Sequence, residues 1–140
     1  MEQLGEPSTG AELTEAQRAL VDRFVDAFEA YDPDRLTELM HEDAALSMPP
    51  YELWLRGHES LREWFRTRGG GCHGSRLVPT RANGSPAFLQ YRAAAGGGHE
   101  AWALVVLEVR EDRIEEMANF LDVEAVFPLF GAPLLLPPTR

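Results

Sequence analysis

A strand that ends at two prolines places the strongest constraint on how this chain can fold. The apolar run Ala44–Met48 predicts a short strand. Pro49 and Pro50 must end its hydrogen-bond ladder, because proline has no N–H to donate. Tyr51 and Trp54 therefore follow on an irregular segment beside a strand end. Large aromatic side chains in such a place are typical of a small-molecule pocket.

The apolar spacing around this segment is helical. Thr14 and Gln17 form a capping-box sequence, and the helix that follows them should end near Tyr31. Asp32 and Pro33 predict a second, shorter helix, with the aspartate as its cap and the proline at its first position. After the aromatic segment a third helix is predicted, with an apolar stripe at Leu61, Trp64 and Phe65.

The second half of the chain has the alternation of strands. Four strands are predicted, over Ser75–Arg81, Ala87–Ala93, Ala101–Arg110 and Arg113–Val123. Short connections make them mostly antiparallel. The expected fold is α+β, with three N-terminal helices packed on a strongly curved sheet. We expect residues 1–13 to form a flexible lead-in and residues 14–140 a single domain. The apolar segment Phe127–Phe130 should close one end of the fold or cover a partner subunit.

Composition excludes several classes of function. The net charge is −10, and the 13 basic residues, all arginines, are scattered along the chain. Without a basic face, binding to nucleic acid or to an anionic membrane surface is not expected. The single cysteine allows no internal disulfide, and the four histidines lack metal-ligand spacing. No apolar run is long enough for a membrane span. We therefore predict a cytoplasmic protein with no metal.

Several short segments of the sequence resemble a known protein family. The order of elements, with 41–44 leading a strand and 119–122 closing the last one, resembles the SnoaL-like branch of the NTF2-like superfamily over about residues 14–131. Longer strings are similar to the accessory C-terminal domain of certain extracytoplasmic-function sigma factors. These strings cover residues 44–51, 54–57, 74–80 and 127–131. The strand that leads into Met48 and Pro49 and the closing strand at 119–122 also resemble limonene epoxide hydrolase, more loosely.

The resemblance implies a conical pocket, homodimers through the outer face of the sheet, and cofactor-free enzymes that cyclise, isomerise or hydrate apolar substrates. The epoxide hydrolase activates water with two aspartates bridged by an arginine. The resemblance places Gln90 at the arginine, and Arg92 and Asn119 at the aspartates. Since a carboxamide cannot act as a base, epoxide hydrolysis by that mechanism is not expected.

Three residues are candidate catalytic groups, namely Tyr51, Tyr91 and His99. A histidine titrates near neutral pH, and a tyrosine hydroxyl can donate to an oxygen that gains charge. Each has a structural alternative. His99 follows a glycine run and can be a solvated hairpin residue, and Tyr91 can pack its ring in a half-apolar strand.

Candidate substrate-binding residues come from the same segments: Met48, Trp54, Trp64, Gln90, Trp102 and Asn119. Trp64 shares a helical stripe with core residues, so it can also be core. Asn119 stands between Met117 and Leu121 on one strand face, where a carboxamide should be buried and must find partners. Those partners can be a substrate carbonyl or hydroxyl, or the protein itself. We expect Tyr51, Gln90 and Asn119 to touch one pocket.

The sequence is consistent with two functions. The first is a freestanding SnoaL-like enzyme that cyclises or isomerises an apolar oxygenated natural-product intermediate by acid–base catalysis. The second is a ligand-sensing or regulatory interaction domain without chemistry, as the sigma-factor resemblance implies. A pocket lined by tryptophan and methionine with no acid–base pair within reach would favour the second.

Overall fold

The computed structural model describes residues 14–49, 54–67, 74–82, 85–110 and 113–137. The elements follow one another as α1 (Glu15–Ala30), α2 (Pro33–Glu38), β1 (Met40–Ser47), β2 (Trp54–Arg56), α3 (His58–Arg66), β3 (Arg76–Ala82), β4 (Ser85–Ala93), β5 (His99–Arg110), β6 (Arg113–Phe120), α4 (Val123–Val126), the 3-10 helix η3 (Phe127–Phe130) and β7 (Leu135–Leu136). In this part of the chain, no helix has the length and apolar character needed to cross a bilayer.

Local signals fix both ends of α1. The Thr14 hydroxyl accepts a hydrogen bond from the Gln17 amide, and the Gln17 side chain accepts one from the Thr14 amide, so the predicted capping box is confirmed. The helix ends at Tyr31, which adopts a left-handed conformation with φ of 50°. Its hydroxyl donates to the carbonyl of Phe65 at 2.9 Å. The residue that ends α1 therefore also holds α3.

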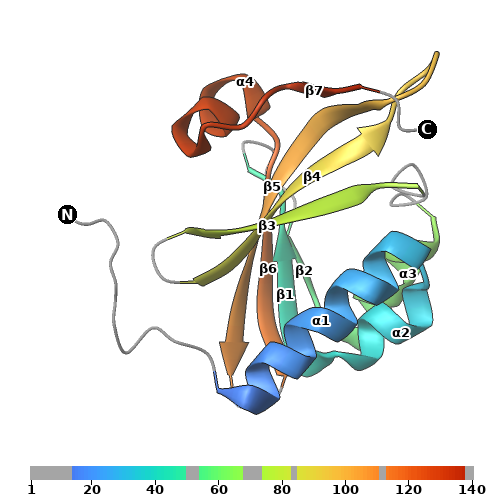
Figure 1. Cartoon of the computed structure of the whole chain (residues 1–140). Helices are drawn as coiled ribbons and strands as arrows, with labels where there is room; N and C mark the ends of the chain where they lie inside the picture. The colour runs from blue at the N-terminus through green and yellow to red at the C-terminus, as the bar shows by residue number, and fades with distance from the viewer. Residues whose placement is uncertain (1–13, 50–53, 68–73, 83–84, 111–112, 138–140) are drawn as a thin grey trace.

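The strands form one curved sheet in the order β2-β1-β6-β5-β4-β3, with β7 added beside β5 (Figure 1). All neighbouring strands are antiparallel except β1 and β6, which run parallel. The pairing register shifts between Gln90 and Tyr91 and again between Glu108 and Val109. The extra residues are Trp102 on β5 and Glu115 on β6. Bulges of this kind bend the bulged strand and increase its twist, which accounts for the curvature of β5 and β6.

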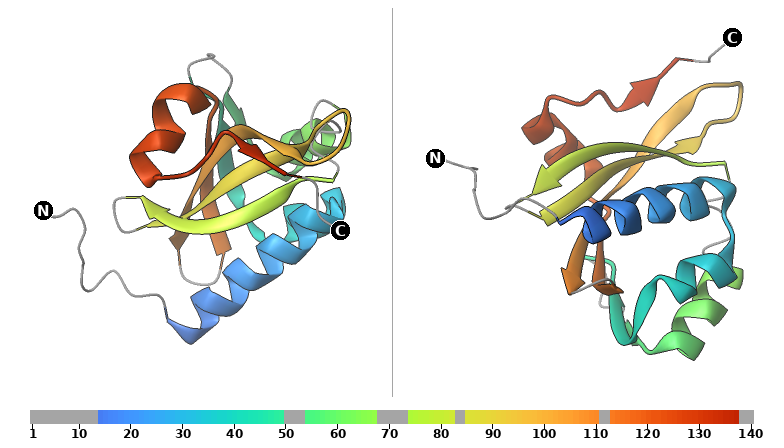
Figure 2. Two further views of the ribbon diagram at one scale, coloured as in Figure 1. Left: turned by 45° about the horizontal axis from the view of Figure 1, so that its top comes forward. Right: turned by 60° about the horizontal axis from the view of Figure 1, so that its bottom comes forward.

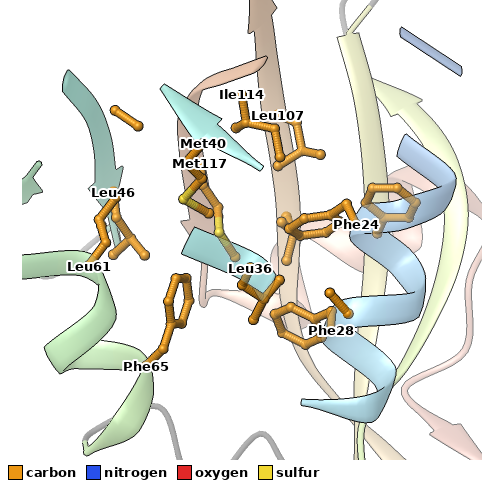
Figure 3. Packing of buried hydrophobic residues seen from close by; sticks show 14 of the residues in the cluster. Phe24, Phe28, Leu36, Met40, Leu46, Leu61, Phe65, Leu107, Ile114 and Met117 are labelled. Atoms are coloured by element: carbon orange, nitrogen blue, oxygen red, sulfur yellow. The ribbon is translucent and has the colours of Figure 1, made fainter. Parts of the chain in front are cut away.

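The inner face of the sheet packs on the three helices α1, α2 and α3 and forms the larger core. Phe24 stacks on Phe88 with ring centroids 5.6 Å apart and lies 5.7 Å from Phe28. Figure 3 shows how α1 and α3 approach the sheet from two sides, with Leu36 between them. The strands contribute Met40, Leu46, Leu77, Val105, Leu107, Ile114 and Met117.

The outer face carries a second, smaller core beneath the C-terminal segment. Phe127 is fully buried there with Leu89, Tyr91 and Leu104. The views in Figure 2 place α4, η3 and β7 on the side of the sheet opposite to α1. The apolar segment Phe127–Phe130 thus covers the outer face of its own sheet, and the expectation that it closes one end of the cone is wrong.

The α+β fold and the curved sheet are confirmed, but the expectation of three N-terminal helices needs correction. Only α1 and α2 precede the sheet, because β1 and β2 intervene before α3. The short elements β2, α4, η3 and β7 were not predicted from the sequence. The expected lead-in, residues 1–13, lies outside the described residues.

Candidate functional site

Strand alternation brings two carboxamides to the inner face of the sheet. Gln90 on β4 pairs with Ala103 on β5, and Asn119 on β6 pairs with Val105 on β5. Ala103 and Val105 both belong to the inner core, so Gln90 and Asn119 face the same side. Both are buried, with 1% and 4% of their surfaces exposed. Gln90 and Asn119 therefore share one face of the sheet, and their contact with one pocket stays a prediction.

Asn119 is held by donation of its amide nitrogen. Its Nδ2 donates to the carbonyl of Ser47 at 3.1 Å and lies 3.5 Å from the carbonyl of Met117. Both acceptors are carbonyl oxygens, so the orientation of the carboxamide is fixed. The hydrogen bonds within the described residues use only the NH₂ group, which leaves Oδ1 as an acceptor for a bound molecule. The Ser47 bond also ties the end of β1 to β6.

Gln90 forms a second buried polar pair. Its Nε2 donates to the hydroxyl of Ser75 at 3.1 Å, and Ser75 is 3% exposed. Ser75 directly precedes β3, so this pair joins the start of β3 to β4. Ser75 was not among the predicted site residues. Its position two residues before the buried Leu77 is the sequence signal that could have identified it, since residues i and i+2 of a strand share a face.

Partly buried apolar side chains pack against the inner core as well. Met48, Trp64 and Trp102 are partly buried and pack against the inner core, as does Leu121. The guanidinium carbon of Arg92 lies 4.1 Å from the centre of the Trp102 ring, in cation–π geometry. Five of the predicted substrate-binding residues thus lie on the inner side of the sheet or against its core, namely Met48, Trp64, Gln90, Trp102 and Asn119. Their role in binding a substrate stays a prediction.

Tyr91 faces the other way. Because Gln90 and Tyr91 are consecutive in a strand, their side chains point to opposite faces. The Tyr91 ring packs edge-on against Phe127 with centroids 5.4 Å apart, and its hydroxyl donates to the carbonyl of Pro133 at 2.8 Å. Burial raises the pKa of Tyr91, so the phenol stays protonated at neutral pH. Tyr91 holds the C-terminal segment and does not share a site with Gln90 and Asn119.

His99 also lies on the strand face opposite to the two carboxamides. It pairs with Ala93 and Leu136 at the start of β5, on the same strand face as Ala101 and Tyr91. One ring nitrogen, Nε2, lies 3.2 Å from the carbonyl of Gly74, and Nδ1 is buried without a partner among the described residues. The prediction that His99 and Tyr91 act on one substrate together with the inner-face carboxamides is not supported by this placement.

The two aromatics after the proline pair have different outcomes. Trp54 on β2 is 63% exposed, and it pairs with Ser47, whereas its neighbour Leu55 packs against the inner core. The assignment of Trp54 to the substrate site is therefore wrong, because strand alternation turns its ring outward. Tyr51 lies outside the described residues, so its place in a pocket stays a prediction.

Three titratable groups of the described residues near the inner core are used in structural contacts. The Tyr31 hydroxyl bonds Phe65, His58 Nε2 lies 2.7 Å from the Met40 carbonyl, and the Glu29 carboxylate accepts the Leu77 amide. Nowhere in the described ranges do three His, Cys, Asp or Glu side chains gather as a metal site would require. Among the described residues, Gln90, Ser75 and Asn119 give the inner face groups that can form hydrogen bonds.

Comparisons with known proteins agree with this architecture. The SnoaL-like domain family matches residues 21–117. The extracytoplasmic-function RNA polymerase sigma factor SigG of Mycobacterium tuberculosis is 39% identical over 121 residues, which are 85% of this chain and 32% of that protein. The chain therefore spans about a third of the length of this curated relative.

Solved structures of similar fold share little sequence with the chain. An NTF2-like protein of unknown function from Burkholderia xenovorans has a TM-score of 0.61 at 15% identity, over 76% of this chain and 83% of that one. An LEH-like epoxide hydrolase from Mycobacterium tuberculosis has a TM-score of 0.58 at 23% identity, over 81% and 87%. These similarities establish the NTF2-like fold, and the chain belongs to the SnoaL-like domain family.

Proposed function

We propose that this chain is a ligand-binding domain whose inner sheet face holds an apolar small molecule bearing a hydroxyl group. The observation that carries the proposal is the buried Asn119, whose NH₂ group is taken by protein carbonyls. A ligand carbonyl would need that donor, whereas a ligand hydroxyl can donate to Oδ1. Trp64, Trp102 and Met48 supply the apolar surface.

Binding without turnover fits the described inner face better than acid–base catalysis. Carboxamides do not titrate, so Gln90 and Asn119 can orient a ligand but cannot move a proton. Of the three catalytic candidates, Tyr91 and His99 lie on the strand face opposite to Gln90 and Asn119. The cyclase or isomerase hypothesis now depends on Tyr51, which is its remaining candidate for an acid.

The sigma-factor similarity also supports a sensing role. In SigG the matched region is one third of a longer protein. A domain that binds an apolar molecule and reports its presence to a partner or to neighbouring domains is a regulatory module of the kind proposed from the sequence.

The first test measures the affinity for hydroxylated terpenes and aromatic polyketides, each paired with its methyl ether. The methyl ether keeps the apolar area but cannot donate a hydrogen bond. We expect the hydroxyl compound to bind about 3- to 10-fold more tightly, as one buried hydrogen bond predicts. In the Asn119→Ala variant this difference should vanish. Isothermal titration calorimetry gives both affinities, and Trp54→Phe is the matched control, because Trp54 is exposed.

Equal affinities of alcohol and ether for the wild-type protein would contradict the proposal. Product formation from an epoxide or polyketide substrate, lost in Tyr51→Phe, would instead establish the enzyme hypothesis. General acids contribute roughly 100- to 10,000-fold to rate, so a Tyr51→Phe variant that retains full turnover would exclude Tyr51 as that acid.

We also propose that the protein forms a homodimer through the outer face of the sheet. A groove of about 830 Å³ runs there between the β5–β6 strands and η3. Leu129 at its edge is 81% exposed, and the rim carries both an arginine and two glutamates, Arg81, Glu108 and Glu116. A surface with an apolar groove, an apolar projection and charges of both signs can complement its own copy.

Leu129→Arg should therefore convert a dimer into a monomer, because a charge would be buried in the apolar groove. Light scattering coupled to gel filtration measures the mass directly. Leu134→Arg is the matched control outside the groove lining and should remain dimeric. A wild-type protein of 15.6 kDa in solution at micromolar concentration would refute the dimer.

A further inference from the structure

Three arginines surround one hollow on the side of the fold where α1, α2 and the start of β6 meet. The hollow has a volume of about 330 Å³, and its lining consists of Arg23, Arg35, Glu38, Leu39 and Arg113. Each arginine comes from a different element. Neither the polar carboxamides of the inner face nor the outer groove contribute to this lining, so the hollow is a separate site.

Backbone hydrogen bonds hold the three elements in place. The amide of Ile114, next to Arg113, donates to the carbonyl of Leu39 at 3.0 Å. The amide of Asp32 donates to the carbonyl of Ala27 at 2.9 Å, which fixes α2 against the end of α1. These hydrogen bonds fix the backbone positions from which the three arginines extend. The arginine side chains themselves are exposed.

Three carboxylates close in sequence to these arginines bond other partners. Asp32 accepts the Arg35 backbone amide as the cap of α2. The Asp34 carboxylate forms salt bridges with Arg62 at 3.1 Å and with Arg66 at 3.0 Å. Glu115 lies 3.9 Å from Arg110. Among the described residues, no ion pair within 4.0 Å involves Arg23, Arg35 or Arg113.

This concentration of positive charge stands against the charge of the whole chain. The chain carries −10 overall, yet the lining holds three cations and one carboxylate, Glu38. Like charges around one hollow repel one another, and a bound anion would remove that repulsion. Guanidinium groups are also the side chains best suited to oxyanions, because their planar forks donate paired hydrogen bonds.

We propose that this hollow binds a phosphate or diphosphate group. Guanidinium forks that approach from three elements can reach different oxygens of a tetrahedral oxyanion, whereas one planar carboxylate is satisfied by a single fork. The volume exceeds that of one phosphate ion and lies at the lower end of the usual range for ligand pockets. The site therefore has room for a diphosphate or for the ester of a small molecule.

The test titrates sodium pyrophosphate and inorganic phosphate into the full chain at constant ionic strength by calorimetry. We expect pyrophosphate to bind more tightly than phosphate. Arg35→Gln and Arg113→Gln should each weaken pyrophosphate binding about tenfold or more, the loss expected for a charge-assisted hydrogen bond. Glu38→Gln should strengthen binding, because it removes the negative charge from the lining. Circular dichroism verifies that each variant is folded.

Arg76→Gln is the matched control, since Arg76 is an exposed arginine on β3 outside the hollow. A loss of affinity in Arg76→Gln equal to that in Arg35→Gln would overturn the site, because attraction would then be general. The proposal would also be overturned if pyrophosphate did not bind at concentrations up to roughly 10 mM, which is above the millimolar range of weak ligands. Equal affinity for citrate would overturn the assignment to phosphate.

Discussion

Replacement of Phe24 by alanine should lower the free energy of unfolding by about 3–5 kcal/mol, as large-to-small changes of buried aromatics do. Phe24 is fully buried on α1 and contacts the rings of Phe28 and Phe88. Its removal leaves a cavity between α1 and the sheet, where its ring stacks on Phe88. Since domains of this size have a total stability of about 5–15 kcal/mol, the loss would bring the fold close to its limit. Urea denaturation followed by circular dichroism measures it.

Phe24→Leu is the control for this result. It keeps most of the buried apolar volume and should cost much less than the alanine variant. If Phe24→Ala unfolded at the same urea concentration as the wild type, the inner core could not be the main source of stability.

Replacement of Phe127 by alanine should destabilise the protein by a similar amount, but only in the C-terminal segment. Phe127 is the fully buried anchor of the C-terminal segment on the outer face and contacts Tyr91. Since α4, η3 and β7 pack on this face and not on the helices, they can detach while the inner core stays folded. If the free energy of local unfolding of the C-terminal segment falls by about 3 kcal/mol or more, its amides should exchange hydrogen about 100-fold faster.

The amides to follow are those of Ala101 and Ala132, which donate to the carbonyls of Leu134 and Phe127. Hydrogen exchange measured by NMR should accelerate at both and remain nearly unchanged at Ile114 on β6. Leu134→Ala, a partly exposed position in the same segment, is the matched control. Equal acceleration at Ile114 would mean that the segment and the inner core unfold as one unit.

Local sequence signals were sufficient for the parts of the fold that depend on neighbouring residues. The Thr14 capping box and the Asp32-Pro33 start both appear as predicted, because a cap needs only three or four consecutive residues. The burial of Asn119 followed from the period-2 pattern with Met117 and Leu121. That prediction required no knowledge of the neighbouring strands.

The errors arose where the facing of a side chain depends on distant parts of the chain. Tyr91 and Trp54 were assigned to a pocket by residue type, but strand alternation turns both away from the inner face. The bulge at Gln90 and Tyr91 cannot be read from a single strand. Nor does the segment around Phe127 contain a signal that says which face of the sheet it will cover, since that depends on tertiary packing.

The parallel pairing of β1 with β6 has a consequence for how the protein is made. Ser47 and Asn119, which join these strands, are 72 positions apart in the chain. Pairing across such a separation must bear the entropy of closing a long loop before any contact stabilises it. The pairing of β1 with β6 in the sheet therefore cannot form on the ribosome until β6 has emerged. The helices α1 and α2 are synthesised earlier and have no complete sheet to pack against until then. Until then the nascent chain exposes the apolar side chains of its inner core, and exposed apolar surface of this kind favours aggregation.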